Sequence, residues 1–68
     1  MPTNEELQEN YETFDQIRGK INNMMEYIKI ALAEKVGTID LTTTQITAIK
    51  ARYATEKEEM ETLYRTLH

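Results

Sequence analysis

The sequence contains no cysteine, no serine and no tryptophan, and its only histidine is His68. Without cysteine, neither a disulfide nor a thiolate metal site can stabilise the fold. The serine and cysteine nucleophiles of covalent catalysis are also missing, and a histidine base would have to lie at a fraying chain end. We therefore expect a protein that is not an enzyme and has no catalytic residues.

Other ligand-binding signatures are absent as well. The two glycines, Gly19 and Gly37, lie far apart, so there is no glycine-rich phosphate loop. No Glu-x-x-His pair of the kind found in di-metal helical bundles occurs, and we expect neither a metal nor a cofactor. The net charge is -4 and basic residues form no cluster, which argues against direct binding of nucleic acid.

Long hydrophobic runs are also missing. The longest stretch with few charges runs from Val36 to Ile49 and is interrupted by Asp40, so it falls short of the ~20 apolar residues that span a membrane. The first residues contain neither a basic segment nor an apolar core typical of a signal peptide. We expect a soluble protein with no membrane partner, located in the cytoplasm or within a soluble multi-protein particle and not secreted by a signal peptide.

The chain has 68 residues, of which 40% are hydrophobic and 29% charged, enough for one small domain. A single pair of helices buries only one apolar stripe per helix, whereas every ordered residue loses conformational entropy. With no disulfide or metal to compensate, we expect the chain to associate with itself as a homo-oligomer or to pack against other protein subunits.

The clearest local signals lie in the middle of the chain. Thr42 followed three residues later by Gln45 forms a capping box, and Leu41 and Ile46 occupy the two positions of a hydrophobic staple. Gly37 supplies a stop, because a helix commonly ends on a left-handed residue that glycine adopts without steric cost. These signals predict two helices joined by a short turn.

Thr3 and Glu6 form a second capping box that begins the first helix. The expected fold is all-α, an antiparallel two-helix hairpin that associates into a four-helix bundle or packs into a larger assembly. Its shape is similar to that of small hairpin proteins that dimerise as four-helix bundles, a likeness of architecture without a shared motif. The single domain, 1–68, divides into a helix over about 4–36, a turn over 37–42 and a helix over about 43–67.

Apolar residues in the first helix follow a heptad repeat in which only Arg18 interrupts positions a and d. Ile17 and Met24 occupy the adjacent g position and widen the apolar face, which favours packing against two neighbours in a bundle. The apolar residues at a and d are Leu7, Tyr11, Phe14, Ile21, Met25, Ile28 and Leu32.

The second helix has a matching pattern in which Glu56 takes a d position and Tyr64 extends the stripe at position e. Aligning the stripes of the two helices antiparallel pairs Met25 with Tyr53 and Phe14 with Tyr64. The apolar residues at a and d are Ile46, Ile49, Tyr53, Met60, Leu63 and Leu67.

In this alignment Arg18 lies opposite Met60 and within reach of Glu56 or Glu59. We expect Arg18 to pair with one of these two glutamates, and we expect this pair to fix the register and the choice of partner rather than to add net stability. Off the main stripe, Tyr27 and Ile30 form a small second apolar patch, either covered by the turn or used as a subunit contact. The residues predicted to line the interface are Tyr11, Phe14, Ile17, Ile21, Met24, Met25, Ile28, Tyr53, Met60 and Tyr64.

With catalysis, membranes and nucleic acid set aside, the remaining function is contact between proteins. We expect a structural or adaptor protein that acts by helix–helix contacts, as a small subunit of a larger assembly such as a virion. The alternative is a small acidic regulator that sequesters a basic or nucleic-acid-binding partner. This alternative function requires a negatively charged surface, which the acidic residues of the first helix would provide, namely Glu5, Glu9, Glu12 and Asp15.

Overall fold

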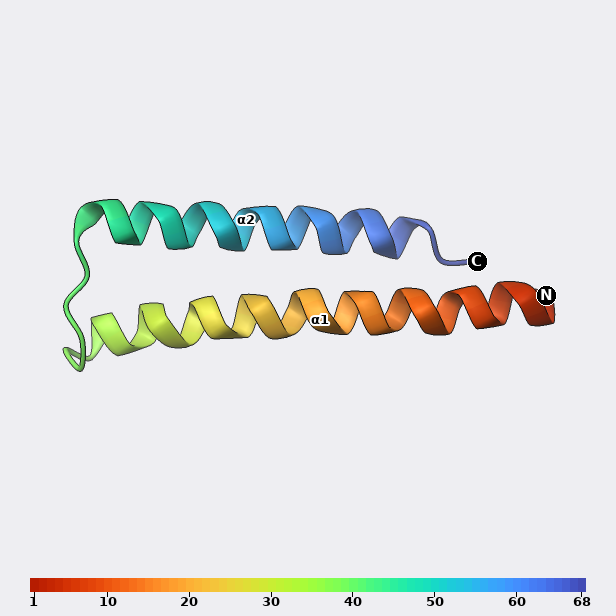
Figure 1. Cartoon of the computed structure of the whole chain (residues 1–68), viewed down its shortest axis with the longest axis horizontal. Helices are drawn as coiled ribbons and strands as arrows, with labels where there is room; N and C mark the ends of the chain where they lie inside the picture. Colours follow the sequence, from red (N-terminus) through yellow and green to blue (C-terminus); the bar gives the residue numbers. More distant parts are fainter.

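The computed structural model describes residues 1–68 as two antiparallel helices, α1 (Asn4–Lys35) and α2 (Thr43–Arg65), joined by one loop (Figure 1). The hairpin measures 50 × 17 × 12 Å, and both ends of the chain lie at the end opposite the loop. The predicted all-α antiparallel hairpin is confirmed. Both helices begin at the predicted residues, and they end slightly earlier than expected, at Lys35 and Arg65.

Both helix starts are held by the predicted capping boxes. The Thr3 amide donates to Glu6 Oε1 at 3.1 Å and the Glu6 amide donates to Thr3 Oγ1 at 3.2 Å. In α2 the Thr42 amide donates to Gln45 Oε1 at 2.9 Å and the Gln45 amide donates to Thr42 Oγ1 at 3.1 Å. Each box satisfies two amides that the helix itself leaves without a partner.

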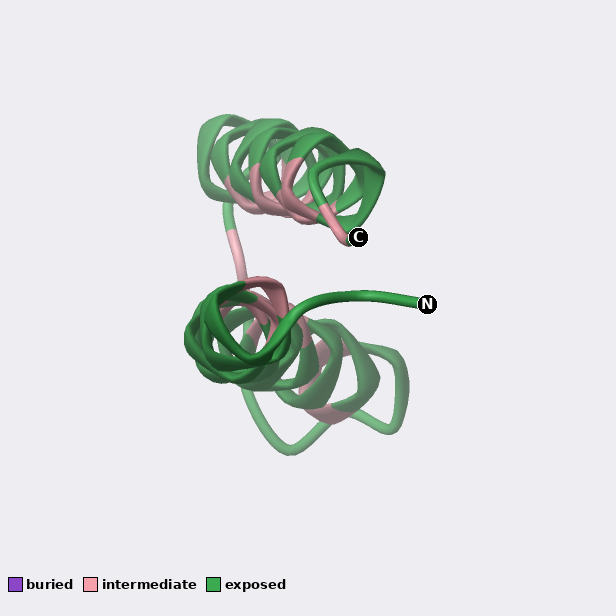
Figure 2. Cartoon of the chain, turned by 90° about the vertical axis from the view of Figure 1, so that its right-hand side faces the viewer, coloured by how far each residue is buried: buried purple, intermediate pink, exposed green.

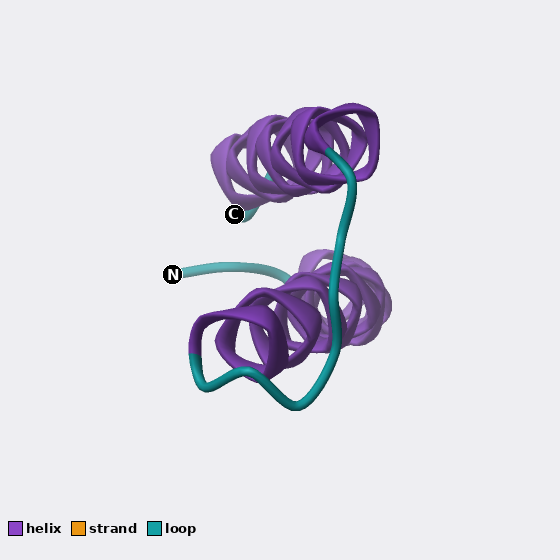
Figure 3. Ribbon diagram, turned by 90° about the vertical axis from the view of Figure 1, so that its left-hand side faces the viewer, coloured by secondary structure: helices purple, strands orange, loops and turns teal.

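Gly37 ends α1 as predicted. Its φ of +81° is left-handed, and two hydrogen bonds close the last turn in a Schellman arrangement. The Thr38 amide donates to the Ala33 carbonyl at 2.9 Å, and the Gly37 amide donates to the Glu34 carbonyl at 3.1 Å. The chain then crosses to α2 over a loop that spans the distance between the two helices (Figure 3).

The two helices touch along one narrow seam, and no residue of the chain is buried. The half-buried residues lie on the sides of α1 and α2 that face each other (Figure 2). On α2 and the residues that follow it, these are the residues predicted for positions a and d together with the interrupting glutamate: Ile46, Ile49, Tyr53, Glu56, Met60, Leu63 and Leu67.

On α1 a different face meets α2 from the one predicted. Phe14 and Met25 are 53% and 50% exposed and Tyr64 is 68% exposed, so the expected pairing of Phe14 with Tyr64 and of Met25 with Tyr53 is wrong. The half-buried residues of α1 lie instead mainly at positions c and g of the heptad, among them Thr13, Ile17, Lys20, Met24 and Tyr27.

This rotation of α1 has a physical reason. Apolar side chains cover a wider arc of α1 than one neighbouring helix can contact, so α2 covers only part of it. The part it covers includes Lys20, which provides a cation for the half-buried Glu56 of α2. It also includes Tyr27, which with Ile30 borders a depression shared with Leu41 and Ala48, so this second patch adjoins α2.

The two glycines should respond oppositely to alanine. An alanine Cβ at Gly19 would meet nothing within 4 Å in a helix interior, so we expect Gly19→Ala to raise the free energy of unfolding by ~1 kcal/mol. At Gly37 the positive φ strains any residue with a Cβ. Gly37→Ala should therefore lower the free energy of unfolding by ~1 kcal/mol. Urea unfolding followed by circular dichroism at one protein concentration measures the free energy of unfolding of both variants. Changes of the same sign in the two variants would contradict the placement of Gly19 inside a helix and of Gly37 at a left-handed helix end.

Candidate interaction surface

A long row of exposed apolar side chains lies along α1, on the side that α2 leaves open. Seven large side chains there are between 41% and 68% exposed. They occupy the a and d positions and follow the helix over nearly its full length. We call them the α1 stripe: Leu7, Tyr11, Phe14, Ile21, Met25, Ile28 and Leu32.

The α1 stripe lies beside the seam with α2 and not on the opposite side of α1. Positions a and d are roughly 110° around the helix axis from the c and g positions that touch α2. Ile17 and Met24, predicted for the interface, are half-buried and face α2, whereas Ile21, Met25 and Ile28 are exposed. This angle suits a helix with two neighbours, as in a four-helix bundle.

The α1 stripe continues into a groove along α2 near the loop. Ile28 of the stripe borders a depression together with Ala31, Ile49 and Tyr53. A second depression, closer to the loop, shares Ala31 and Ile49 and extends to Leu41. A partner covering the stripe would therefore also contact the edge of α2 at this end of the molecule.

The remaining surface of α2 offers little apolar area. Tyr64 is the only large hydrophobic residue of α2 that is exposed. Of the other α2 residues predicted for the interface, Tyr53 and Met60 are half-buried and lie in the seam with α1. The apolar surface available to a partner is thus carried by α1.

An ion cluster at mid-length sets how α1 and α2 are aligned. Lys20 Nζ lies 2.5 Å from Glu59 Oε2 and 3.6 Å from Glu56 Oε2, and Asn23 Nδ2 donates to Glu56 Oε2 at 3.3 Å. The hydrogen bond to Glu59, with the charge of Glu56 adding to it, raises the pKa of Lys20 above its ordinary value. The contribution of Lys20 to stability is therefore present below about pH 10.5 and is lost as the pH rises through the raised pKa.

The expected role of Arg18 in this cluster is wrong. Arg18 pairs with Asp15 of its own helix, and both side chains are exposed. Position a directs Arg18 toward the open stripe, whereas Lys20, two residues further on, points at α2. The stagger itself was predicted correctly, because a cation near this point of α1 does meet Glu56 and Glu59.

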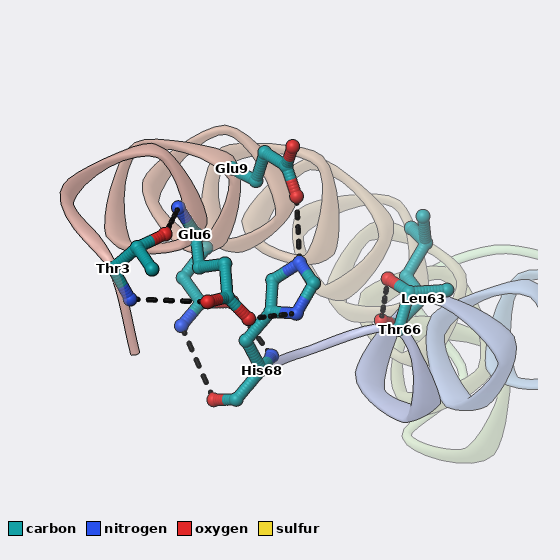
Figure 4. Close-up of polar contacts among 7 residues, drawn as sticks. Thr3, Glu6, Glu9, Leu63, Thr66 and His68 are labelled. Carbon is teal, nitrogen blue, oxygen red and sulfur yellow. Dashed lines mark hydrogen bonds and ion pairs between the residues drawn. The ribbon is translucent and has the colours of Figure 1, made fainter. Parts of the chain in front are cut away.

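A second polar cluster holds the open end of the hairpin around His68 (Figure 4). His68 Nε2 lies 2.6 Å from Glu9 Oε2, and its Nδ1 lies 3.0 Å from Glu6 Oε2. The His68 amide donates to Asn10 Oδ1 at 2.8 Å, and Asn10 Nδ2 donates to the His68 carbonyl at 3.3 Å. From the sequence, His68 was expected to lie at a fraying chain end, and this cluster was not predicted. The pattern that could have indicated it is two glutamates and an asparagine on one side of α1, at the level that the single histidine reaches in an antiparallel hairpin.

Glu6 belongs both to this cluster and to the capping box of α1. The hydrogen bond that it accepts from the Thr3 amide, followed by that from the Thr3 hydroxyl, lowers the pKa of Glu6 below its ordinary value near 4.5. Nearby His68 acts in the same direction. The contribution of Glu6 to stability is thus present above about pH 4.5 and is lost as the pH falls through the lowered pKa.

Three further observations complete the description of the surface. Neither helix is long and apolar enough to cross a membrane. No group of three or more His, Cys, Asp and Glu side chains is arranged to hold a metal ion. Comparison of the chain with protein-family models, with curated proteins and with solved structures finds no match.

The two cations of mid-α1 should differ in their effect on stability. We expect Lys20→Gln to lower the melting temperature clearly, because the half-buried Glu56 loses its cation. Arg18→Gln removes only an exposed pair within one helix and should have a much smaller effect. Thermal unfolding by circular dichroism, with the association state of each variant checked by sedimentation, measures the difference; a larger effect at Arg18 would contradict the structure.

The capping box should be visible in the titration of Glu6. Thr3 has a φ of -73°, which proline can adopt, so Thr3→Pro removes both hydrogen bonds to Glu6 without changing the backbone. We expect this substitution to raise the pKa of Glu6, measured by NMR titration of the side-chain carboxyl carbons. Thr42→Pro, at the matching cap of α2 with a φ of -72°, should leave the Glu6 titration unchanged. Equal shifts in both variants would contradict the assignment.

Proposed function

We propose that the protein is a structural or adaptor protein without enzymatic activity, and that it acts by helix–helix contacts with protein subunits. The observation that carries this proposal is the α1 stripe, whose seven large apolar side chains are open along a chain in which no residue is buried. An apolar surface of this length, interrupted only by Arg18, is typical on a small protein of a protein–protein contact.

The rest of the hairpin supports this use by keeping α1 in place. Capping boxes begin both helices, the Lys20 cluster aligns them at mid-length, and the His68 cluster joins them at the open end. The stripe is thereby presented on a rod 50 Å long. We infer a small subunit of a larger assembly, such as a virion or another multi-protein particle.

The alternative, an acidic regulator of a basic partner, has weaker support. Of the four acidic residues on which it depends, Glu9 contacts His68 and Asp15 pairs with Arg18. Only Glu5 and Glu12 lack an ion pair within the chain, which leaves little concentrated negative charge for a basic target. The apolar stripe is the stronger of the two features.

Salt dependence and two sets of variants distinguish these functions. We expect capture of the native partner to change little between about 0.05 and 0.5 M salt, because apolar packing is not screened. Phe14→Asp should abolish capture while circular dichroism shows an intact hairpin. The matched control neutralises all four acidic residues together (Glu5→Gln, Glu9→Gln, Glu12→Gln, Asp15→Asn) and should leave capture intact.

The opposite pattern would support the regulator. Loss of capture on neutralisation, or in high salt, together with normal capture by Phe14→Asp, contradicts the adaptor proposal. If neither set of substitutions affects capture, the partner does not use α1 and both proposals fail.

A further inference from the structure

We infer that the α1 stripe is covered by the α1 stripe of a second copy of this chain, with the two α1 helices antiparallel about a two-fold axis. This inference rests on the proposed function, in which the α1 stripe binds protein subunits. It identifies one of these subunits as a second copy of the same chain. The resulting dimer has α1 and its copy at the centre and one α2 on each side.

The distribution of apolar residues selects the second α1 as the covering element. A neighbour that covers the stripe must bring an apolar surface of similar length. Within this chain α2 cannot provide it, since its apolar residues lie in the seam and only Tyr64 is exposed. The stripe of a second copy has the right length, and a two-fold axis places the same surface on both sides of the contact.

The available area is sufficient for a dimer. The 32 residues of α1 extend over about 48 Å at roughly 1.5 Å per residue. A helix–helix contact is about 10 Å wide, so each copy would bury on the order of 500 Å², or about 1,000 Å² in total. That total lies at the lower end of specific interfaces, and the groove beside Ile28 and Tyr53 adds to it.

Charge along the edge of the stripe favours the antiparallel orientation. A parallel arrangement would place Arg18 beside the partner's Arg18, because position a of one helix then meets position a of the other. In the antiparallel arrangement the acidic first half of α1 faces the half that carries Lys29 and Lys35. Asp15 and Lys29 share heptad position e, and antiparallel helices bring position e of one against position e of the other.

One register satisfies both the charges and the apolar residues. When Phe14 lies level with the partner's Leu32, Ile21 lies level with the partner's Met25 and Tyr11 with the partner's Lys35. Asp15 then lies within two residues, about 3 Å along the helix, of the level of the partner's Lys29. Arg18 already pairs with Asp15, so its charge is compensated at the edge of the apolar contact.

Sedimentation equilibrium of the full chain tests the dimer. We expect a dimer at micromolar concentration, and Phe14→Asp should raise its dissociation constant at least about a hundredfold, because the substitution occurs twice in a two-fold contact. The matched control Ala51→Asp adds the same charge at an exposed position of α2 and should leave the dimer unchanged.

Cysteine cross-linking tests the orientation, since the chain has no cysteine of its own. Tyr11→Cys mixed with Lys35→Cys should form a disulfide-linked heterodimer under mild oxidation, whereas neither variant alone should link to itself. Self-linking of each single variant indicates parallel helices, and absence of any link excludes this register; either result overturns the inference.

A monomeric wild-type chain at micromolar concentration overturns the inference without overturning the proposed function. In that case loss of partner capture by Phe14→Asp still assigns the stripe to a different protein. If capture and self-association are both insensitive to Phe14→Asp, the proposed function fails together with the inference.

Discussion

The half-buried carboxylate of Glu56 is the constraint on which the arrangement of the hairpin depends. Glu56 occupies a seam position of α2 and its side chain is only 16% exposed, so it requires a cation and a hydrogen-bond donor from α1. Lys20 and Asn23 provide them, in an arrangement in which positions c and g of α1 face α2. That rotation directs Phe14 and Met25 away from the seam and thereby creates the α1 stripe.

Features that depend on neighbours in the sequence could be predicted, and the rotation of one helix about its axis could not. Thr42 with Gln45 and Gly37 act within a few residues, so their roles follow from residue type and spacing. The stagger of the helices follows from the length of the loop. The part of the apolar arc of α1 that faces α2 depends instead on contacts between the helices, such as that between Lys20 and Glu56. From the sequence alone, Arg18 and Lys20 were both candidates for the cation that pairs with Glu56.

The same distinction applies to the surface. Apolar periodicity identified Tyr11, Phe14 and Ile28 as interface residues, but it could not show that α2 would leave them exposed, because heptad positions do not indicate which partner they meet. The cluster around His68 was missed for a related reason. A lone histidine outside a helical repeat has no periodicity, and its contacts with Glu6 and Glu9 exist only once the hairpin has closed.

The division of residues between seam and stripe couples folding to association. On α1 the seam combines apolar residues with polar side chains such as Asn10, Thr13 and Lys20, and no residue in it is fully buried, so packing of α2 on α1 removes only part of the apolar surface from water. The other large apolar residues of α1 lie on a surface that the hairpin does not cover by itself. Any partner that binds this surface binds only the folded chain and therefore stabilises it by mass action. In the dimer that we propose, a second copy supplies to each chain the apolar core that its own two helices do not form.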